Sequence, residues 1–451
     1  MYMQSNKKFI YFILIVILSF YIFQYSAFLI HSLLIDRVIK IMVVPCLFLV
    51  FQNSGFSSRL EKSIMVFYCL LFACTLIYPL FQGSFVMSLL TTSKLFYMFL
   101  ILPLVLIKFS KFNNLPDSVI KFVIYFGFVF SVQSIILFLI IYYDFSVTPT
   151  YINLERYFNT VERSYGILGY ANAILGGADG NILRVQSWFL EPSVFAGFLM
   201  YPLFVSLGVF LMEKKKMYLL ICIVCIIAFI MTFSFAGYFA FIGGIVVLLL
   251  FRYKKNLKRN MVTQIFISII GLLIFFVMIS YIMKRSQNMF DVLRGHSTRI
   301  EKTFVRDKHG GTGGLDRKAA GSKFVMETIL RHPFGVGFVY NEKMMGSCNA
   351  FLFWAVAGGF PAILILIIIY YNLIYKNALL LLQSGNHIYR GVAAAFIAST
   401  IQALGYGDWI KPYYLLNIAI MILLANRVRK KGLAKTLNNN NKYISTDEVC
   451  I

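Results

Sequence analysis

Two stretches of the sequence place charged residues where they could do chemistry. The first is RVQSWFLEPS at 184–193, in which Glu191 directly precedes Pro192. Proline favours the first turn of a helix, and the positive end of the helix dipole stabilises a nearby carboxylate. Glu191 therefore has two interpretations. It is either a carboxylate that favours a helix end, or a base that works beside Arg184 and takes a proton from a substrate.

The second stretch is strongly basic. Residues 284–347 contain twelve Lys and Arg but only six Asp and Glu. Long loops cross membranes regardless of their charge, so no single residue here requires a function. Taken as a set, the arginines favour binding of a diphosphate, because a guanidinium group binds phosphate oxygens in a bidentate way.

Within this basic stretch, residues 316–331 predict an amphipathic helix. Its apolar face contains Phe324, Val325 and Ile329, and its charged face contains Lys323, Glu327 and Arg331. His332-Pro333 ends the helix. The glycines of GVGF at 335–338 then allow close approach to a ligand or another chain.

Several catalytic signatures are absent from the sequence. It has no D-x-D, no H-E-x-x-H and no G-x-S-x-G, and the histidines of the basic stretch lack the spacing of metal ligands. We therefore expect no metal and no cofactor. Cys222 and Cys225 form a C-x-x-C inside an apolar block, where buried thiols are the better interpretation.

The elements that position these residues are predicted to be membrane helices. The chain is 60% hydrophobic and 13% charged, with a mean hydropathy of +0.78, which no soluble class of protein matches. We expect an all-α polytopic membrane protein whose spans lie at 9–27, 38–52, 64–82, 92–107, 120–143, 192–211, 217–233, 236–251, 261–283, 350–373, 391–405 and 412–426. The apolar run at 217–252 is too long for one helix, so we predict a hairpin that breaks near Ser234–Gly237.

Charge predicts the orientation of these spans. Three basic clusters, at 214–216, 252–259 and 427–431, fall on one side, which places both termini in the cytoplasm. This placement also explains most of the net charge of +24 without a nucleic-acid partner.

The chain then divides into four parts. Residues 1–283 hold nine spans and a medium outer loop at 144–190, residues 284–349 form a large outer loop, residues 350–426 hold three spans, and residues 427–451 form a cytoplasmic tail.

The order of several motifs resembles that of the bacterial O-antigen polymerase and ligase superfamily. These motifs are the R-x(6)-EPS segment, TFSFAGY at 232–238, the basic loop that ends in HPFGVGF, and CNAFLFWAVAGGFPA at 348–362. The resemblance covers roughly residues 180–365. It implies metal-independent glycosyl transfer at the periplasmic face of the bacterial inner membrane, from a glycan carried on undecaprenyl diphosphate.

The resemblance also implies roles for individual residues. Ligases of the superfamily have a His before the residue that aligns with Asn349, whereas this chain has Cys348, so a polymerase is favoured and a ligase is the close alternative. We expect catalytic roles for Glu191, Arg184 and Arg317, and substrate binding by Arg331, Asn349 and Lys323. The expected partners are an undecaprenyl-diphosphate-linked oligosaccharide, membrane lipid and a chain-length regulator protein.

Two further classes of function stay open. A polysaccharide flippase or other transporter would explain the spans, but such proteins usually carry ionisable groups inside the membrane, which are scarce here. A scaffold that binds lipid-linked glycans without reacting them is equally compatible with the sequence.

Overall fold

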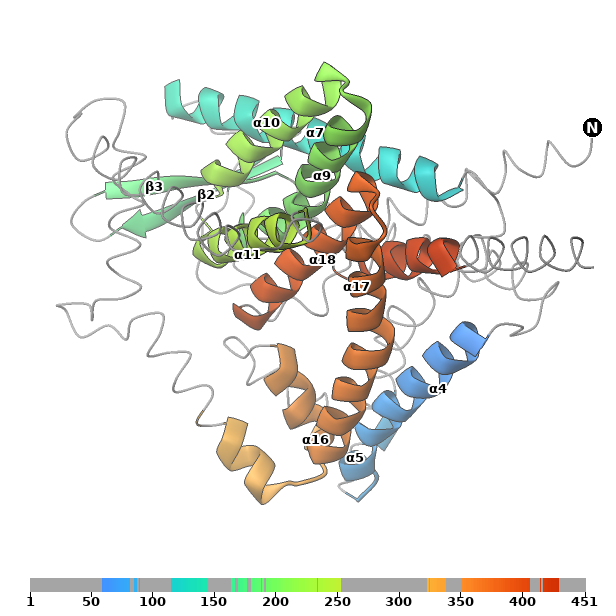
Figure 1. Ribbon diagram of the computed structural model, residues 1–451. Coiled ribbons are helices and arrows are strands. Elements are labelled where there is room, and N and C mark those ends of the chain that lie inside the picture. Colours follow the sequence, from blue (N-terminus) through green and yellow to red (C-terminus); the bar gives the residue numbers. More distant parts are fainter. Residues whose placement is uncertain are drawn as a thin grey trace, which may run out of the picture.

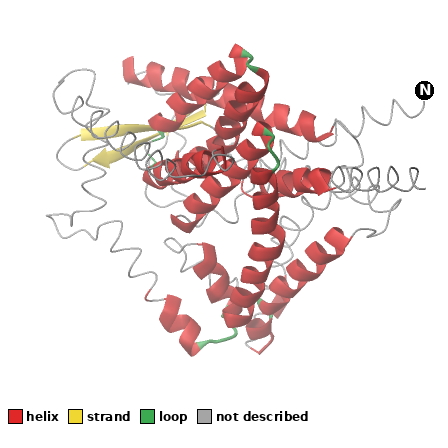
Figure 2. Ribbon diagram, viewed as in Figure 1, coloured by secondary structure: helices red, strands yellow, loops and turns green. Residues whose placement is uncertain are grey.

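The computed structural model describes about half of the chain, and most of the described part is helical (Figures 1 and 2). The described residues are 59–81, 85–86, 89, 115–143, 164–166, 169–176, 180–187, 189, 192–232, 234–252, 323, 325–337, 350–405, 414 and 417–429. Three helical stretches are long and apolar enough to cross a membrane: Asp117–Leu139, Pro192–Glu213 and Trp354–Gln383. These stretches agree with the expected helical membrane protein, whereas the expected spans at 9–27, 38–52, 92–107 and 261–283 lie outside the described residues.

Described helices overlap the other expected spans, but the span at 64–82 is broken after Cys74 and the span at 350–373 continues to Gln383. In chain order they are α4 (Arg59–Cys74), α5 (Ile77–Phe81), α7 (Leu115–Tyr143), α9 (Pro192–Glu213), α10 (Lys216–Met231), α11 (Phe235–Arg252), α16 (Ala350–Ile369), the π-helix η3 (Tyr370–Tyr375), α17 (Lys376–Gln383), α18 (His387–Gly405) and a final helix at 417–429. The predicted hairpin is confirmed, because α10 ends at Met231 and α11 begins at Phe235. Ser234 Oγ accepts a hydrogen bond from the Gly237 amide at 3.3 Å and so caps the start of α11.

Helix α9 lies at the centre of the bundle and contacts α7, α10, α11 and α18. It runs antiparallel to α18, because Ser193 at its start lies beside Gln402 and Gly208 near its end lies beside His387. Glycines bring the two backbones close together. A Cβ atom on Gly391 would stand 2.6 Å from the Phe204 carbonyl oxygen, and one on Gly208 would stand 2.5 Å from that of His387.

Charged residues gather at the end of the bundle where α9 finishes and α18 begins. Asp117 of α7 forms an ion pair with Arg427 of the final helix at 3.1 Å. In the α9–α10 turn, Lys215 pairs with Glu213 at 2.7 Å, and this hydrogen bond raises the pKa of Lys215. Two of the basic clusters used to predict the orientation therefore lie at the same end of the bundle.

A small sheet corrects the expectation of an entirely α-helical chain. Within the predicted outer loop at 144–190, β1 (Ser164–Gly166), β2 (Gly169–Gly176) and β3 (Gly180–Ser187) form an antiparallel sheet in the order β1-β2-β3. Glycines end or begin each strand and favour tight connections between them. The sheet contacts α7, and β3 also contacts α9 (Figure 1).

Candidate functional site

Residues 333–337, near the end of the predicted large loop, pack against a break in helix α16. We call them the docked segment. Gly359 interrupts this helix with a φ of 67° and a ψ of −159°. In an unbroken helix the Phe360 amide would donate to the Val356 carbonyl. Here the Phe360 amide donates to the Pro333 carbonyl at 2.9 Å, and the Val356 carbonyl accepts from the Val336 amide at 2.8 Å. The loop backbone therefore supplies both partners that the break removes from α16.

Glycines make this backbone contact possible. A Cβ atom on Gly359 would stand 2.1 Å from the Pro333 oxygen, and one on Gly335 would stand 2.5 Å from the Ala357 oxygen. Gly337, with a φ of 78°, approaches Pro79 of α5 in the same way. The close approach expected of the GVGF glycines is present, but the partners are α16 and α5 of the same chain, whereas the sequence had suggested a ligand or another chain.

The amphipathic helix predicted before this segment is confirmed over residues 325–331. Val325 and Ile329 are buried, and they form a small apolar cluster with Val336, Ala355 and Val356. The opposite face exposes the predicted charged residues, which are Lys323, Glu327 and Arg331. His332 follows and packs edge-on against Tyr78, with 5.1 Å between the ring centroids.

The second candidate region lies where β3 ends and α9 begins, and we call its described residues (185–187, 189, 192 and 193) the β3–α9 corner. Pro192 is the first residue of α9, as predicted. Gln186 and Ser187 at the end of β3 are fully buried, and the Phe189 amide donates to the Gln186 carbonyl at 3.0 Å. Ser187 has a φ of 52°, which is uncommon outside glycine and is found more often at functional sites than elsewhere.

A glutamine from α18 completes this corner. Gln402 Nε2 donates to the Ser193 carbonyl at 2.5 Å, in the first turn of α9. Among the described residues, the buried Oε1 of Gln402 and the buried Oγ of Ser187 have no hydrogen-bond partner. Most buried polar atoms in proteins have a hydrogen-bond partner, so these two atoms of the corner are unusual within the described core.

The structure locates only some of the predicted site residues. Arg184 lies in β3, where it pairs in register with Asn172, and Lys323 and Arg331 are exposed near the docked segment. Glu191, Arg317 and Asn349 lie outside the described residues. In Figure 1, β3 and the helix at 325–331 occupy separate parts of the molecule, so the structure does not bring Arg184 and Arg331 together.

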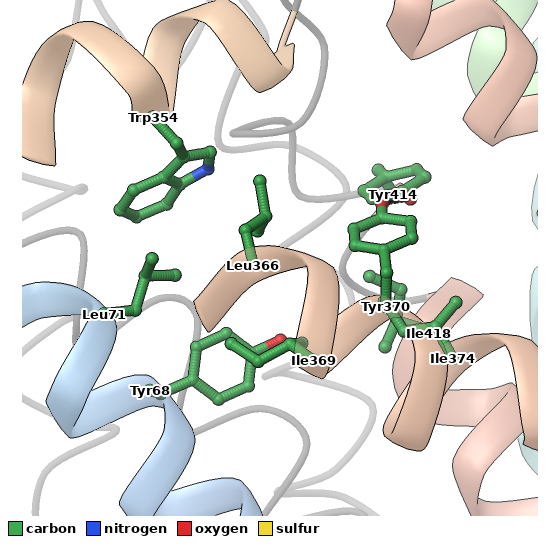
Figure 3. A pocket seen from close by; sticks show the side chains of 9 residues that line it. All are labelled: Tyr68, Leu71, Trp354, Leu366, Ile369, Tyr370, Ile374, Tyr414 and Ile418. Atoms are coloured by element: carbon green, nitrogen blue, oxygen red, sulfur yellow. Dashed lines mark hydrogen bonds between the residues drawn. The ribbon is translucent and has the colours of Figure 1, made fainter. Parts of the chain in front are cut away.

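A third polar cluster lies inside the bundle, where α4, α16, η3 and the final helix meet. Tyr68, Trp354, Tyr370 and Tyr414 line a cavity of about 10 Å³, together with apolar side chains (Figure 3). Tyr414 forms hydrogen bonds with Tyr370 and with Thr400. A cavity of this volume holds about one water molecule, so it is too small for a sugar.

Sequence analysis missed two features of these regions. Gln402 is a polar residue inside an expected span, and that alone marks a residue of interest in a membrane helix. Ser187 carried no signal, because its importance lies in its backbone conformation. The described residues contain no group of His, Cys, Asp and Glu side chains that could hold a metal ion, while Cys222 and Cys225 are buried as expected.

Comparison of the chain with protein-family models, with curated proteins and with solved structures finds no match.

Proposed function

We propose that this chain is a glycosyltransferase that polymerises lipid-linked repeat units of O-antigen or a similar surface polysaccharide. The donor is an undecaprenyl-diphosphate-linked glycan, and the acceptor is a second lipid-linked repeat unit. The reaction takes place at the periplasmic face of the bacterial inner membrane, with both termini of the chain in the cytoplasm.

One observation carries this proposal. Two of the sequence motifs that resemble the superfamily, HPFGVGF and the AGGFP of α16, are joined by reciprocal backbone hydrogen bonds between 333–336 and 356–360. Two motifs that bond to each other in the fold support a family resemblance more strongly than two motifs that lie far apart. The glycines of both motifs are required by this junction, and this shared requirement supports the proposal.

The proposed chemistry is a displacement at the anomeric carbon of the donor sugar. A hydroxyl oxygen of the acceptor attacks this carbon, and the bond from the carbon to the diphosphate oxygen breaks. Glu191 takes the hydroxyl proton, and undecaprenyl diphosphate leaves with the bonding electrons. Arg184 and Arg317 stabilise the charge that grows on the diphosphate, while Arg331, Lys323 and Asn349 bind the substrate.

The charged end of the bundle supports the proposed orientation. The α9–α10 turn and the final helix both bring cations to the end opposite the β3–α9 corner. Basic short loops face the cytoplasm, so the corner and the docked segment face the periplasm. Impermeant thiol labelling at Ser322→Cys and Asn256→Cys, in a background without native cysteines, tests this. Labelling in spheroplasts is expected at position 322 alone.

Reconstitution tests the activity. The purified protein in liposomes, supplied with lipid-linked repeat units and no metal, is expected to produce a ladder of longer lipid-linked glycans. Movement of the repeat unit across the bilayer without chain growth would instead identify a transporter. Binding without either outcome would identify a scaffold.

A deletion strain separates polymerase from ligase, an alternative that Cys348 disfavours. If the chain is the polymerase, the strain still attaches single repeat units to its lipopolysaccharide core, because a separate ligase remains. Long polymer that accumulates on the lipid carrier, with none on the core, would identify the chain as the ligase.

A further inference from the structure

The helix at 325–331 has three faces instead of the two that an ordinary amphipathic helix shows. Val325 and Ile329 pack on the protein, while Lys323, Glu327 and Arg331 are exposed and charged. Between these faces lies a third, which is both apolar and exposed. On it, Met326 is 54% exposed and Leu330 is 70% exposed.

The third face continues beyond the helix. Phe334, which follows Leu330 by four residues, is 55% exposed. We call Met326, Leu330 and Phe334 the apolar stripe of the loop. In water, a helix beside a protein buries its large apolar residues on one side and presents polar ones everywhere else. Three large apolar side chains left exposed in a row therefore indicate a surrounding medium that is not water.

The stripe meets a second exposed apolar surface on α16. Phe360, Leu364 and Ile367 follow one another at helical spacing and are each more than half exposed. They belong to the stretch Trp354–Gln383, which is long and apolar enough to cross a membrane, so this surface is the one that faces lipid. The two surfaces join where the Phe360 amide donates to the carbonyl of Pro333, the residue before Phe334.

We propose that the helix at 325–331 lies on the surface of the phospholipid bilayer, with its apolar stripe in the acyl region and its charged face among the headgroups and water. The three faces then correspond to the three surroundings available at this position: protein, lipid and water. Arg331 and Lys323 are suited to headgroup phosphates.

The docked segment fixes this pose. The two hydrogen bonds to α16, and the contact of Gly337 with Pro79, attach the chain immediately after the helix to the bundle. The helix therefore cannot turn its stripe toward water without breaking backbone bonds. Neither the exposed stripe nor its attachment to α16 depends on the activity of the chain, so the proposed pose holds whether or not the chain is a polymerase.

Spin labelling tests the proposal with a matched pair of positions on one helix. Leu330→Cys and Glu327→Cys are each introduced into full-length protein whose native cysteines are replaced by alanine, and both are labelled with a nitroxide. The protein is reconstituted in liposomes of phosphatidylethanolamine and phosphatidylglycerol. Collision rates are then measured with oxygen, which concentrates in lipid, and with a neutral nickel chelate, which stays in water.

The label at 330 is expected to collide severalfold more with oxygen than with the nickel chelate, and the label at 327 is expected to show the reverse. Met326→Cys, on the same stripe, should match position 330 and serves if that variant is poorly produced. Nickel collisions at 330 equal to those at 327 would overturn the proposal. Low collision rates with both reagents at 330 would also overturn it, because the stripe would then be covered by protein.

Discussion

The β3–α9 corner and the docked segment use polar groups in opposite ways. They lie in separate parts of the fold, the corner at the start of α9 and the docked segment at the break in α16. The corner buries polar side chains, including Gln186, Ser187 and Gln402. The docked segment buries backbone groups, and the charged side chains of the helix before it, such as Lys323 and Arg331, are exposed. Buried side chains suit the orientation of a small reacting group, whereas exposed charges suit a large or mobile ligand.

The helices that carry the two regions differ in the same sense. In its most apolar part α9 is 83% buried, and the stretch that contains α16 is 50% buried. The central helix therefore holds the corner by packing on all sides. Helix α16 is less covered by protein, and at its break its backbone hydrogen bonds are made with the loop residues Pro333 and Val336. In the proposed function, Glu191 in the segment before Pro192 takes the proton, whereas Lys323 and Arg331 next to the docked segment bind the substrate.

The largest expected effect concerns the arginine before the loop helix. Arg317→Ala should lower the rate of chain growth by about 100- to 1000-fold, because it removes a donor from the developing diphosphate charge. Arg317→Lys should recover only part of the rate, since lysine lacks the bidentate geometry. Rates are measured with purified lipid-linked repeat units, and full activity in Arg317→Ala would remove this residue from the mechanism.

The next prediction contrasts a carboxylate beside the corner with one on the loop. Glu191→Gln should lower activity by about 100-fold or more if Glu191 is the base, because an amide cannot accept the proton. Glu327→Gln, on the exposed loop face, is the matched control and should retain activity. If Glu191 only stabilises a helix end, its substitution should cost roughly 1 kcal/mol of stability or less and leave polymer length normal.

Stability measurements can test the backbone junction directly. Gly359 and Gly385 both have a positive φ. A Cβ atom at Gly359 would clash with the Pro333 oxygen, whereas a Cβ atom at Gly385 would have no neighbour within 4 Å. Gly385→Ala should therefore cost only the conformational strain, roughly 1–2 kcal/mol. Gly359→Ala should cost about 1–3 kcal/mol more, as overpacking does. Thermal unfolding in detergent compares the two variants, and equal losses would mean that the junction contributes nothing.

The smallest expected effect compares two buried tyrosines. Tyr370 lies after α16 and is hydrogen-bonded to Tyr414, whereas the Tyr201 hydroxyl in α9 has no partner among the described residues. Tyr370→Phe should destabilise the protein by about 1 kcal/mol. Tyr201→Phe should leave the stability unchanged or raise it, because it removes a buried hydroxyl that forms no hydrogen bond with the described residues. A loss for Tyr201→Phe as large as that for Tyr370→Phe would show that this hydroxyl is satisfied after all.

Local patterns in the sequence predicted much of this fold. The start of α9 at Pro192, the hairpin break beside Ser234 and the faces of the loop helix all follow from turn residues and apolar periodicity. The sheet at 164–187 was missed because the polar and apolar residues of this outer segment also suit a long loop. The sequence contained no sign that Pro333 and Val336 would bond to α16, because such pairings depend on the tertiary fold.

The site was less predictable than the fold, for a related reason. Residue type singled out Arg184 and Arg331 as possible partners, but their distance apart depends on how β3 and the loop helix are arranged. Conversely, Gln402 joined the β3–α9 corner only because α18 runs antiparallel to α9. Charge and spacing identify which residues can do chemistry, and the fold decides which of them meet.

The break in α16 also constrains the order in which the protein can be built. Unpaired backbone groups are too costly to leave in lipid, so the Val356 carbonyl and the Phe360 amide need their partners as the helix inserts. Those partners, at 333 and 336, precede α16 in the chain and are therefore synthesised first. If the loop is periplasmic, as proposed, insertion of α16 becomes favourable only after residues 333 and 336 have crossed the membrane, so that translocation of the loop precedes insertion of the helices that follow.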